Sequence, residues 1–204
     1  MLGTFIIISG LSGAGKTVAV ARSIKRCANS ARVITCTTRT PRAGEVDGTD
    51  YRFFTHTVFA RKLAQGEFAE HAEVYGNYYG TLREDIDAAR EHHTIAFLVT
   101  DVQGVKTLRV AYPDARSVWI DMDREEFVAR LEKRGESPEN ITVRMAKIDK
   151  ELAERTLFDK IIANKMGRLD NTVRSLLRYV ARCHRDDTLA QHLRSLSVAP
   201  KHAP

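Results

Sequence analysis

One eight-residue segment near the start of the chain, residues 10–17 with the sequence GLSGAGKT, restricts the fold more than any other. It fits the pattern G-x-x-x-x-G-K-[ST] and follows the apolar run at residues 5–8. Glycines let the backbone curl so that successive N–H groups point at phosphate oxygens, and a helix beginning at Thr17 directs its positive end at them. Lys16 is expected to reach the β- and γ-phosphates, and the Thr17 hydroxyl to hold Mg²⁺. The segment therefore predicts a nucleoside triphosphate site.

The composition indicates one globular domain with an insertion or a tail. The chain has 204 residues, of which 43% are hydrophobic and 28% charged, and this length suffices for a sizeable core. No apolar run approaches the ~18 residues that span a bilayer, and the first one leads into the phosphate loop, unlike a secretory signal. Three widely spaced cysteines form no zinc pattern and predict reduced thiols. We therefore expect a cytoplasmic protein without a membrane segment.

Strands and helices are expected to alternate along most of the chain, which predicts an α/β fold with a parallel sheet covered by helices on both faces. The expected strands are residues 4–9, 32–37, 94–100, 116–121 and 160–163, and the expected helices are 17–28, 82–91, 102–111 and a long helical region at 123–158.

Residues 33–81 interrupt this alternation and predict an inserted α+β lobe. A polar loop at 38–48 is followed by a short strand at 51–54 and by a helix that Thr57 could cap and Gly66 would end. The alternating segment from residue 67 to 81, broken by a Gly-Asn pair, is typical of a hairpin.

The positive charge is concentrated at the end of the chain. The net charge is +6, and residues 165–204 contribute +5 of it through eight Lys/Arg against three Asp. In the same segment, Val173, Leu176, Leu177, Val180 and Ala181 follow helical periodicity, which predicts an amphipathic helix over 170–184 docked on the body. A docked helix with a solvated basic face is favoured over nucleic-acid binding, although RNA binding through the tail remains an alternative.

Two arginines in the predicted lobe suggest where a second substrate binds. Arg39 and Arg42 lie three residues apart on the polar loop, and Tyr79 lies in the hairpin. Arginine forks match phosphate oxygens bidentately, and a tyrosine hydroxyl adds a neutral donor. The alternative is that these are solvated loop arginines and a core tyrosine.

Several segments together resemble guanylate kinase. The pattern T-T-R-x-P-R-x-G-E-x-[DN]-G matches residues 37–48, and G-N-Y-Y-G-[ST] matches 76–81. With the phosphate loop, residues 67–70 and 101–104 and the arginine-rich stretch 130–144, the resemblance covers about residues 3–165 in unbroken order. It implies a P-loop kinase fold with an inserted GMP-binding lobe and a helical lid.

The resemblance assigns roles to individual residues. It implies that Arg39, Arg42, Tyr51 and Tyr79 bind the acceptor's phosphate, that Thr35, Glu70, Thr81 and Asp101 lie at its guanine, and that Ser12, Gly13, Ala14, Gly15, Lys16, Thr17 and Asn164 bind ATP.

The chemistry supports the guanine assignment independently. A carboxylate can accept hydrogen bonds from both N1–H and the 2-amino group of guanine, and a hydroxyl can donate to O6. Adenine presents a lone pair at N1, so Glu70 would be left unpaired, which in favourable cases gives ~10⁴-fold rejection. The alternative for Glu70 is a solvent-facing acid on a strand.

A second basic cluster predicts the lid. Arg130 and Arg134 share a helix face, and the turn at 135–138 ends that helix before the helix carrying Arg144 begins. Phosphoryl transfer spreads negative charge over the moving group, so positioned arginines and Mg²⁺ can supply most of the catalysis without a general base. The residues expected to be catalytic are Lys16, Arg134 and Arg144.

These observations predict an ATP:GMP phosphotransferase that converts GMP, and dGMP, to GDP in purine nucleotide metabolism, with Mg²⁺ and with no membrane partner. A homo-oligomer is left open. The predicted core comprises residues 1–32, 82–122 and 159–165 of a domain at 1–165, with the GMP-binding lobe at 33–81, the lid at 123–158 and a basic helical tail at 166–204. Closure of the lobe is expected to align the acceptor with the γ-phosphate and exclude water.

Two rival functions are considered, and one departure from the family's pattern keeps the first of them open. Val99 stands where the family places the first aspartate of D-x-D, so one carboxylate near the metal is missing. A catalytically silent interaction module usually loses the phosphate-loop lysine or the lid arginines, which this chain retains. A related kinase acting on a phosphorylated sugar should lack base-reading residues, and Thr35, Glu70 and Thr81 argue against it.

Overall fold

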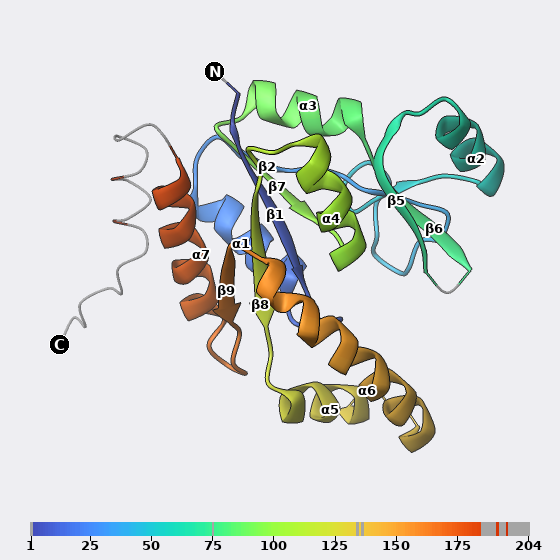
Figure 1. Ribbon diagram of the computed structural model, residues 1–204, viewed down its shortest axis with the longest axis vertical. Coiled ribbons are helices and arrows are strands. Elements are labelled where there is room, and N and C mark those ends of the chain that lie inside the picture. The colour runs from blue at the N-terminus through green and yellow to red at the C-terminus, as the bar shows by residue number, and fades with distance from the viewer. Residues whose placement is uncertain are drawn as a thin grey trace. The chain divides into compact units, whose positions relative to one another are not determined.

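The computed structural model describes residues 2–74, 76–133, 135 and 137–184, with residues 191 and 195; the side chains of residues 130, 133, 143, 144, 146, 147 and 150 lie outside the description. Contacts divide the chain into two compact units. The first comprises residues 1–7 and 29–115, and the second comprises residues 8–28 and 116–204. The long buried strand β1 (Thr4–Gly10) runs from the first unit into the second (Figure 1).

In the first unit, a parallel strand pair is accompanied by the helices that precede and follow its second strand. The short strand β2 (Ser30–Arg32) pairs in parallel with β7 (Ile95–Val99), with Ser30 opposite Ile95. Helix α3 (Arg83–His92) precedes β7, and α4 (Val102–Ala111) follows it. Residues 95–98 are buried and apolar, as expected for a strand covered on both faces.

The same unit holds a four-stranded sheet with the order β4-β3-β6-β5. Strands β3 (Cys36–Thr37) and β4 (Arg52–Phe53) are parallel, whereas β5 (Phe68–Val74) and β6 (Asn77–Leu82) form an antiparallel hairpin. Helix α2 (His56–Ala64) lies beside this hairpin in Figure 1 and contributes Phe59, which stacks on Phe68 with ring centroids 4.3 Å apart. This small core holds the lobe together.

A bulge near the start of β5 affects which side chains face one another. Phe68 pairs with Leu82, but Glu70 pairs with Thr81, so Ala69 is an extra residue on β5. After the bulge the register continues without interruption to Val74 opposite Asn77.

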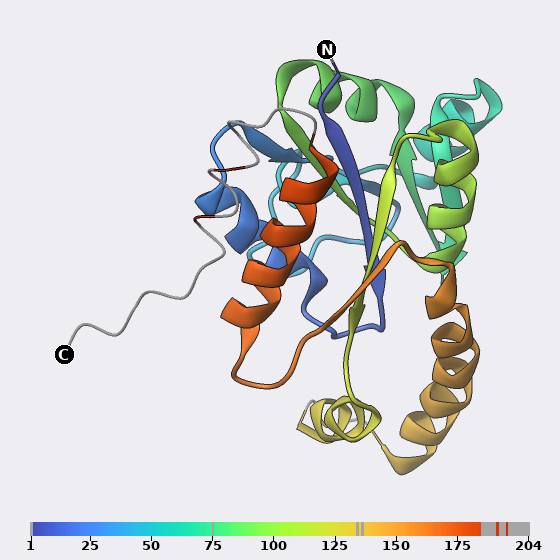
Figure 2. The same cartoon turned by 60° about the vertical axis from the view of Figure 1, so that its left-hand side comes forward.

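The second unit begins with the end of β1 and helix α1 (Lys16–Arg26). Strand β8 (Arg116–Asp121) pairs in parallel with β9 (Lys160–Ala163), and the hydrogen-bonded order of the five-stranded sheet is β2-β7-β1-β8-β9. Helices α5 (Arg124–Lys133) and α6 (Pro138–Ala153), followed by the 3₁₀ turn η1 (Glu154–Leu157), form a helical hairpin that connects these strands (Figure 2).

Helix α7 (Leu169–Cys183) follows β9 in the second unit and packs on α1 and β9. The five apolar side chains predicted to form its inner face are at most 1% exposed: Val173, Leu176, Leu177, Val180 and Ala181. The predicted amphipathic helix is therefore confirmed.

The predicted α/β class with a parallel sheet core is confirmed, but two local predictions are wrong. Residues 32–37 do not form one strand, because the chain changes sheets within them. Val33 N–H donates to the carbonyl of Phe97 at 2.8 Å, whereas the Thr35 carbonyl accepts from Arg52 N–H at 2.9 Å. Thr55, rather than Thr57, caps α2, since its hydroxyl accepts from the backbone N–H of Val58.

Candidate functional site

The phosphate loop joins β1 to α1, and its last glycine sets its geometry. Gly15 is the N-cap of α1 with φ 82° and ψ 19°, a left-handed conformation that favours glycine. A Cβ atom on Gly15 would lie 2.7 Å from Nδ2 of Asn164, so a side chain there would displace the Asn164 amide. No side chain caps α1. Its first backbone N–H groups are thus suited to receive an anion.

Lys16 lies against the loop. Its Nζ donates to the carbonyl oxygens of Gly10 at 2.7 Å and Leu11 at 3.0 Å. Thr17 is exposed in the first turn of α1, next to Lys16, and Ser12 is exposed in the loop. The described residues contain no group of three or more His, Cys, Asp or Glu side chains that could hold a metal ion.

Asn164, at the end of β9, is part of the loop's support. Its side chain is 4% exposed, and Nδ2 donates to the carbonyl of Ala14 at 2.7 Å. Its Oδ1 accepts from the hydroxyl of Thr172 at 2.9 Å. The sequence predicted a contact with adenine, which stays a prediction; the contact with the loop was not foreseen.

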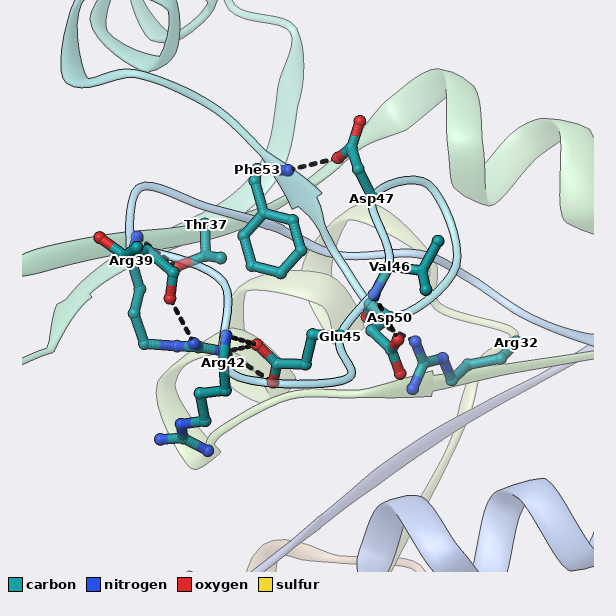
Figure 3. A network of polar contacts seen from close by, with 10 residues as sticks. Arg32, Thr37, Arg39, Arg42, Glu45, Val46, Asp47, Asp50 and Phe53 are labelled. Atoms are coloured by element: carbon teal, nitrogen blue, oxygen red, sulfur yellow. Dashed lines mark hydrogen bonds and ion pairs between the residues drawn. The ribbon is translucent and has the colours of Figure 1, made fainter.

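The polar loop of the lobe is organised around the Glu45 carboxylate, for which no role was predicted (Figure 3). Nη2 of Arg39 donates to both oxygens of Glu45 at 2.9 Å, and the backbone N–H of Arg42 donates to Oε2 at 2.8 Å. The hydrogen bond from the Arg42 N–H lowers the pKa of Glu45 below its usual range, and the Arg39 guanidinium lowers it further by a smaller amount. The only sign of this role in the sequence is that Glu45 belongs to the R-x-G-E part of the guanylate kinase pattern.

Two tyrosines lie next to Arg39. The Cζ atom of Arg39 is 5.5 Å from the centroid of the Tyr51 ring, which meets the Tyr79 ring edge-on at 6.3 Å. Burial raises the pKa of Tyr51, so its hydroxyl remains a donor at neutral pH. The structure thus brings together three of the four residues predicted to bind phosphate. The fourth, Arg42, is an exposed residue of the same loop.

The predicted base-reading pair is buried in the hairpin of the lobe. Glu70 on β5 is 5% exposed and Thr81 on β6 is fully buried, and the Thr81 hydroxyl donates to Oε1 of Glu70 at 2.5 Å. Burial raises the pKa of Glu70 and the nearby charge of Asp101 adds to this change, whereas hydrogen bonds from Thr81 and Thr100 oppose it. The solvent-facing alternative for Glu70 is therefore excluded.

Gly104 makes room beside this carboxylate. A Cβ atom at Gly104 would lie 2.3 Å from Oγ1 of Thr100 and 2.8 Å from Oε2 of Glu70. The residue belongs to the D-V-Q-G segment of the sequence, but its role was not predicted. Asp101, from the same segment, is exposed and caps α4 by accepting from the Gly104 N–H at 2.8 Å. Thr35 is partly exposed, between β2 and β3.

The helical hairpin predicted as a lid begins its second helix with a regular cap. Ser137 accepts from the backbone N–H of Asn140, and Pro138 occupies the first turn of α6. An exposed ion pair between Arg124 and Asp149, 2.6 Å long, joins α5 to α6. Of the predicted lid arginines, Arg134 and the side chains of Arg130 and Arg144 lie outside the described residues.

Comparison of the chain with known proteins identifies its family. The family model described as guanylate kinase matches residues 3–182. The chain belongs to the guanylate kinase family. It is 38% identical to the guanylate kinase of Bdellovibrio bacteriovorus over 161 residues, which cover 78% of this chain and 87% of that protein. It is 37% identical to the guanylate kinase of Alkalilimnicola ehrlichii over 203 residues, covering 96% and 99% of the two chains.

The fold agrees with that membership. The crystal structure of guanylate kinase from Anaplasma phagocytophilum superimposes with a TM-score of 0.72 at 22% identity, covering 96% of this chain and 93% of that one. The guanylate kinase family match extends through α7, whereas the resemblance read from the sequence ended near residue 165. None of the helices in the described part of the chain is long and apolar enough to cross a membrane.

Proposed function

We propose that this member of the guanylate kinase family transfers the γ-phosphoryl group of ATP to GMP, and to dGMP. An oxygen of the acceptor's phosphate forms a bond to the γ-phosphorus while the bond from that phosphorus to the β,γ-bridging oxygen breaks, giving GDP and ADP. The observation that carries the proposal is the buried Glu70 carboxylate paired with Thr81, because an acid this deeply buried requires hydrogen-bond donors. Guanine supplies them.

In the acceptor site, each group has a distinct task. Arg39, Arg42, Tyr51 and Tyr79 would hold the phosphate through charge-assisted and hydroxyl hydrogen bonds. Oε2 of Glu70 would accept from guanine, while Oε1 is held by Thr81. Thr35 and Asp101 complete the proposed guanine-binding set.

In the donor site, the residues proposed to bind ATP are Ser12, Gly13, Ala14, Gly15, Lys16, Thr17 and Asn164. The exposed hydroxyl of Thr17 fits Mg²⁺, which prefers oxygen ligands and is carried largely by substrate phosphates. Mg²⁺ neutralises charge on the phosphates when bound, and Lys16, Arg134 and Arg144 would stabilise the charge on the transferred group.

A pocket of about 320 Å³ adjoins the end of β9, next to Asn164 in the chain. It is lined by Ala163, Lys165, Arg168 and Asn171.

The remaining assignments follow the same proposal. We retain the core at 1–32, 82–122 and 159–165 within a domain at 1–165, the lobe at 33–81, the lid at 123–158 and the tail at 166–204, in a cytoplasmic enzyme of purine metabolism. Binding of nucleic acid by the tail is not favoured, and a homo-oligomer is left open.

The decisive experiment measures ADP release by a coupled assay with ATP and four acceptors: GMP, AMP, CMP and UMP. We expect turnover with GMP to exceed that with AMP by several orders of magnitude, because only guanine pairs with Glu70. Equal rates with GMP and AMP would refute the assignment of Glu70. ADP release at the same rate with all four acceptors would refute the proposed function. A complete lack of ADP release would also refute it and would support the silent interaction module.

A further inference from the structure

Helix α7 is connected to the phosphate loop by a continuous chain of buried hydrogen bonds. The first link is Thr172, in the first turn of the helix, which is 1% exposed. Its hydroxyl lies 2.9 Å from Oδ1 of Asn164 and 3.1 Å from the carbonyl oxygen of Ala163. A hydroxyl has one proton, so Thr172 shares it between these two acceptors and holds the end of β9 against α7.

The second link passes from Asn164 to the loop. Oδ1 of Asn164 accepts from Thr172, and Nδ2 of the same amide points at the Ala14 carbonyl, 2.7 Å away. The reverse orientation would place the amide oxygen against that carbonyl and leave two buried oxygens facing each other. The Ala14 carbonyl, which can only accept, therefore determines which way the Asn164 amide faces, and the Thr172 hydroxyl holds that amide in place by donating to its oxygen.

The hydrogen bond to the Ala14 carbonyl fixes the direction of the Gly15 N–H, one of the groups that the loop offers to phosphate. The Ala14 carbonyl and the Gly15 N–H belong to one planar trans peptide unit and point in opposite directions. Fixing the carbonyl toward Asn164 thus fixes the Gly15 N–H away from it. Gly15, at φ 82°, has no Cβ to resist rotation of this peptide, so the hydrogen bond supplies the restraint that glycine lacks.

The rest of α7 supports this arrangement. Its apolar face is buried, and Asp170 accepts from Arg26 at 2.8 Å and from Arg22 at 3.3 Å on α1, the helix that starts at the loop. These ion pairs are about half exposed and contribute little by themselves. The buried chain of hydrogen bonds, in contrast, fixes the orientation of the groups that it joins.

We infer that Thr172 is a positioning residue of the donor site, acting through Asn164 to hold the phosphate loop in the conformation that binds the phosphates of ATP. This inference rests on the proposed function for its substrate. It assigns the first turn of α7 to the machinery of phosphoryl transfer, whereas the predicted domain boundary at residue 165 leaves that helix in the tail.

The test compares Thr172→Val with Thr172→Ser. Valine keeps the branched shape but removes the hydroxyl, and serine keeps the hydroxyl. The Kd for ATP is measured by calorimetry without acceptor, and the KM values for ATP and GMP are measured by turnover. We expect Thr172→Val to raise the Kd and KM for ATP ~10-fold, equivalent to ~1.4 kcal/mol. The KM for GMP should stay within about twofold, and Thr172→Ser should restore the wild-type Kd.

A matched control is Thr107→Val on α4. Thr107 is exposed, and its hydroxyl likewise donates to a backbone carbonyl, that of Gln103, at 3.2 Å. No change in either Kd or KM is expected. If Thr172→Val does not fold by urea titration, Thr172→Ala removes the hydroxyl without a steric demand and carries the same expectation.

Three results would overturn the inference: an unchanged Kd for ATP in Thr172→Val, a parallel rise in the KM for GMP, or a serine variant as weak as the valine variant. A wild-type protein that binds ATP but does not phosphorylate GMP would instead refute the proposed function, and the Kd values would still judge the role of Thr172. A wild-type protein that binds no ATP would overturn both.

Discussion

Replacement of Glu70 by glutamine tests the base-reading hypothesis with almost no change in shape. The Thr81 hydroxyl donates to Oε1 at 2.5 Å, so the carbonyl oxygen of a glutamine should take that position. The NH₂ group would then replace Oε2, the oxygen nearest to Gly104 and the one proposed to face guanine. A donor would meet the N1–H and 2-amino donors of guanine.

The expected loss can be worked out from these contacts. A hydrogen bond to a charged group is worth ~1.5–3 kcal/mol, and an unpaired buried donor costs ~1–3 kcal/mol. A combined loss of ~3–4 kcal/mol corresponds to a decrease of ~150- to 1000-fold in kcat/KM for GMP. For AMP we expect no decrease, because the new NH₂ group can donate to adenine N1.

The assay is steady-state ADP release with GMP and AMP, together with urea unfolding of each variant. Glu73→Gln is the matched control, since Glu73 lies on the same strand but is exposed. It should leave both acceptors unaffected. A decrease below threefold for GMP in Glu70→Gln, or an equal decrease for GMP and AMP, would contradict the role given to Glu70.

Three further predictions concern stability and the two phosphate sites. Because burial raises the pKa of Glu70 above its ordinary value of 4.5, the folded state holds that proton more tightly. The stabilisation is complete below pH 4.5 and is lost as the pH rises through the raised pKa. Glu70→Gln should therefore reduce the pH dependence of the free energy of unfolding, measured by urea titration at several pH values. An unchanged pH dependence would count against the burial argument. Lys16→Met should lower kcat by ~10³-fold with every acceptor, while Lys25→Met, at an exposed position of α1, should not; residual activity near wild type would remove Lys16 from the mechanism. Arg39→Lys should raise the KM for GMP ~10-fold without changing that for ATP, since lysine lacks the fork, and the exposed Arg61→Lys should change neither; a shift in the KM for ATP alone would contradict this.

The regular elements were predictable because their local signals agree with their tertiary roles. The expected strand at 116–121 is β8, that at 160–163 is β9, and the expected helix at 102–111 is α4, each with the predicted bounds. In each case a change of hydrophobic periodicity coincides with a turn or a capping residue. Asp101, which follows a buried strand and caps the next helix, illustrates this agreement.

The failures occur where pairing partners change without a change in residue type. The segment from Arg32 to Thr37 is strand-like throughout, so nothing in it marks the point between Val33 and Thr35 at which the chain changes sheets. The contact of Asn164 with Ala14 joins residues 150 positions apart, and periodicity carries no information on such pairs. Within the lobe, Glu45 could be recognised as part of a motif, but the motif does not indicate that its carboxylate binds Arg39.

The extra residue at Ala69 has a consequence for how the chain can vary in length. Side chains alternate between the faces of a strand, and the bulge sets the phase in which Glu70 meets Thr81. Deleting Ala69 would retain every residue of the proposed guanine-binding set, yet the strand would have to slip by one position or lose the pairing of Glu70 with Thr81. Substitutions at Ala69 that keep a small side chain should be tolerated there. Base selectivity in this protein therefore depends on residue count in β5 as well as on residue identity.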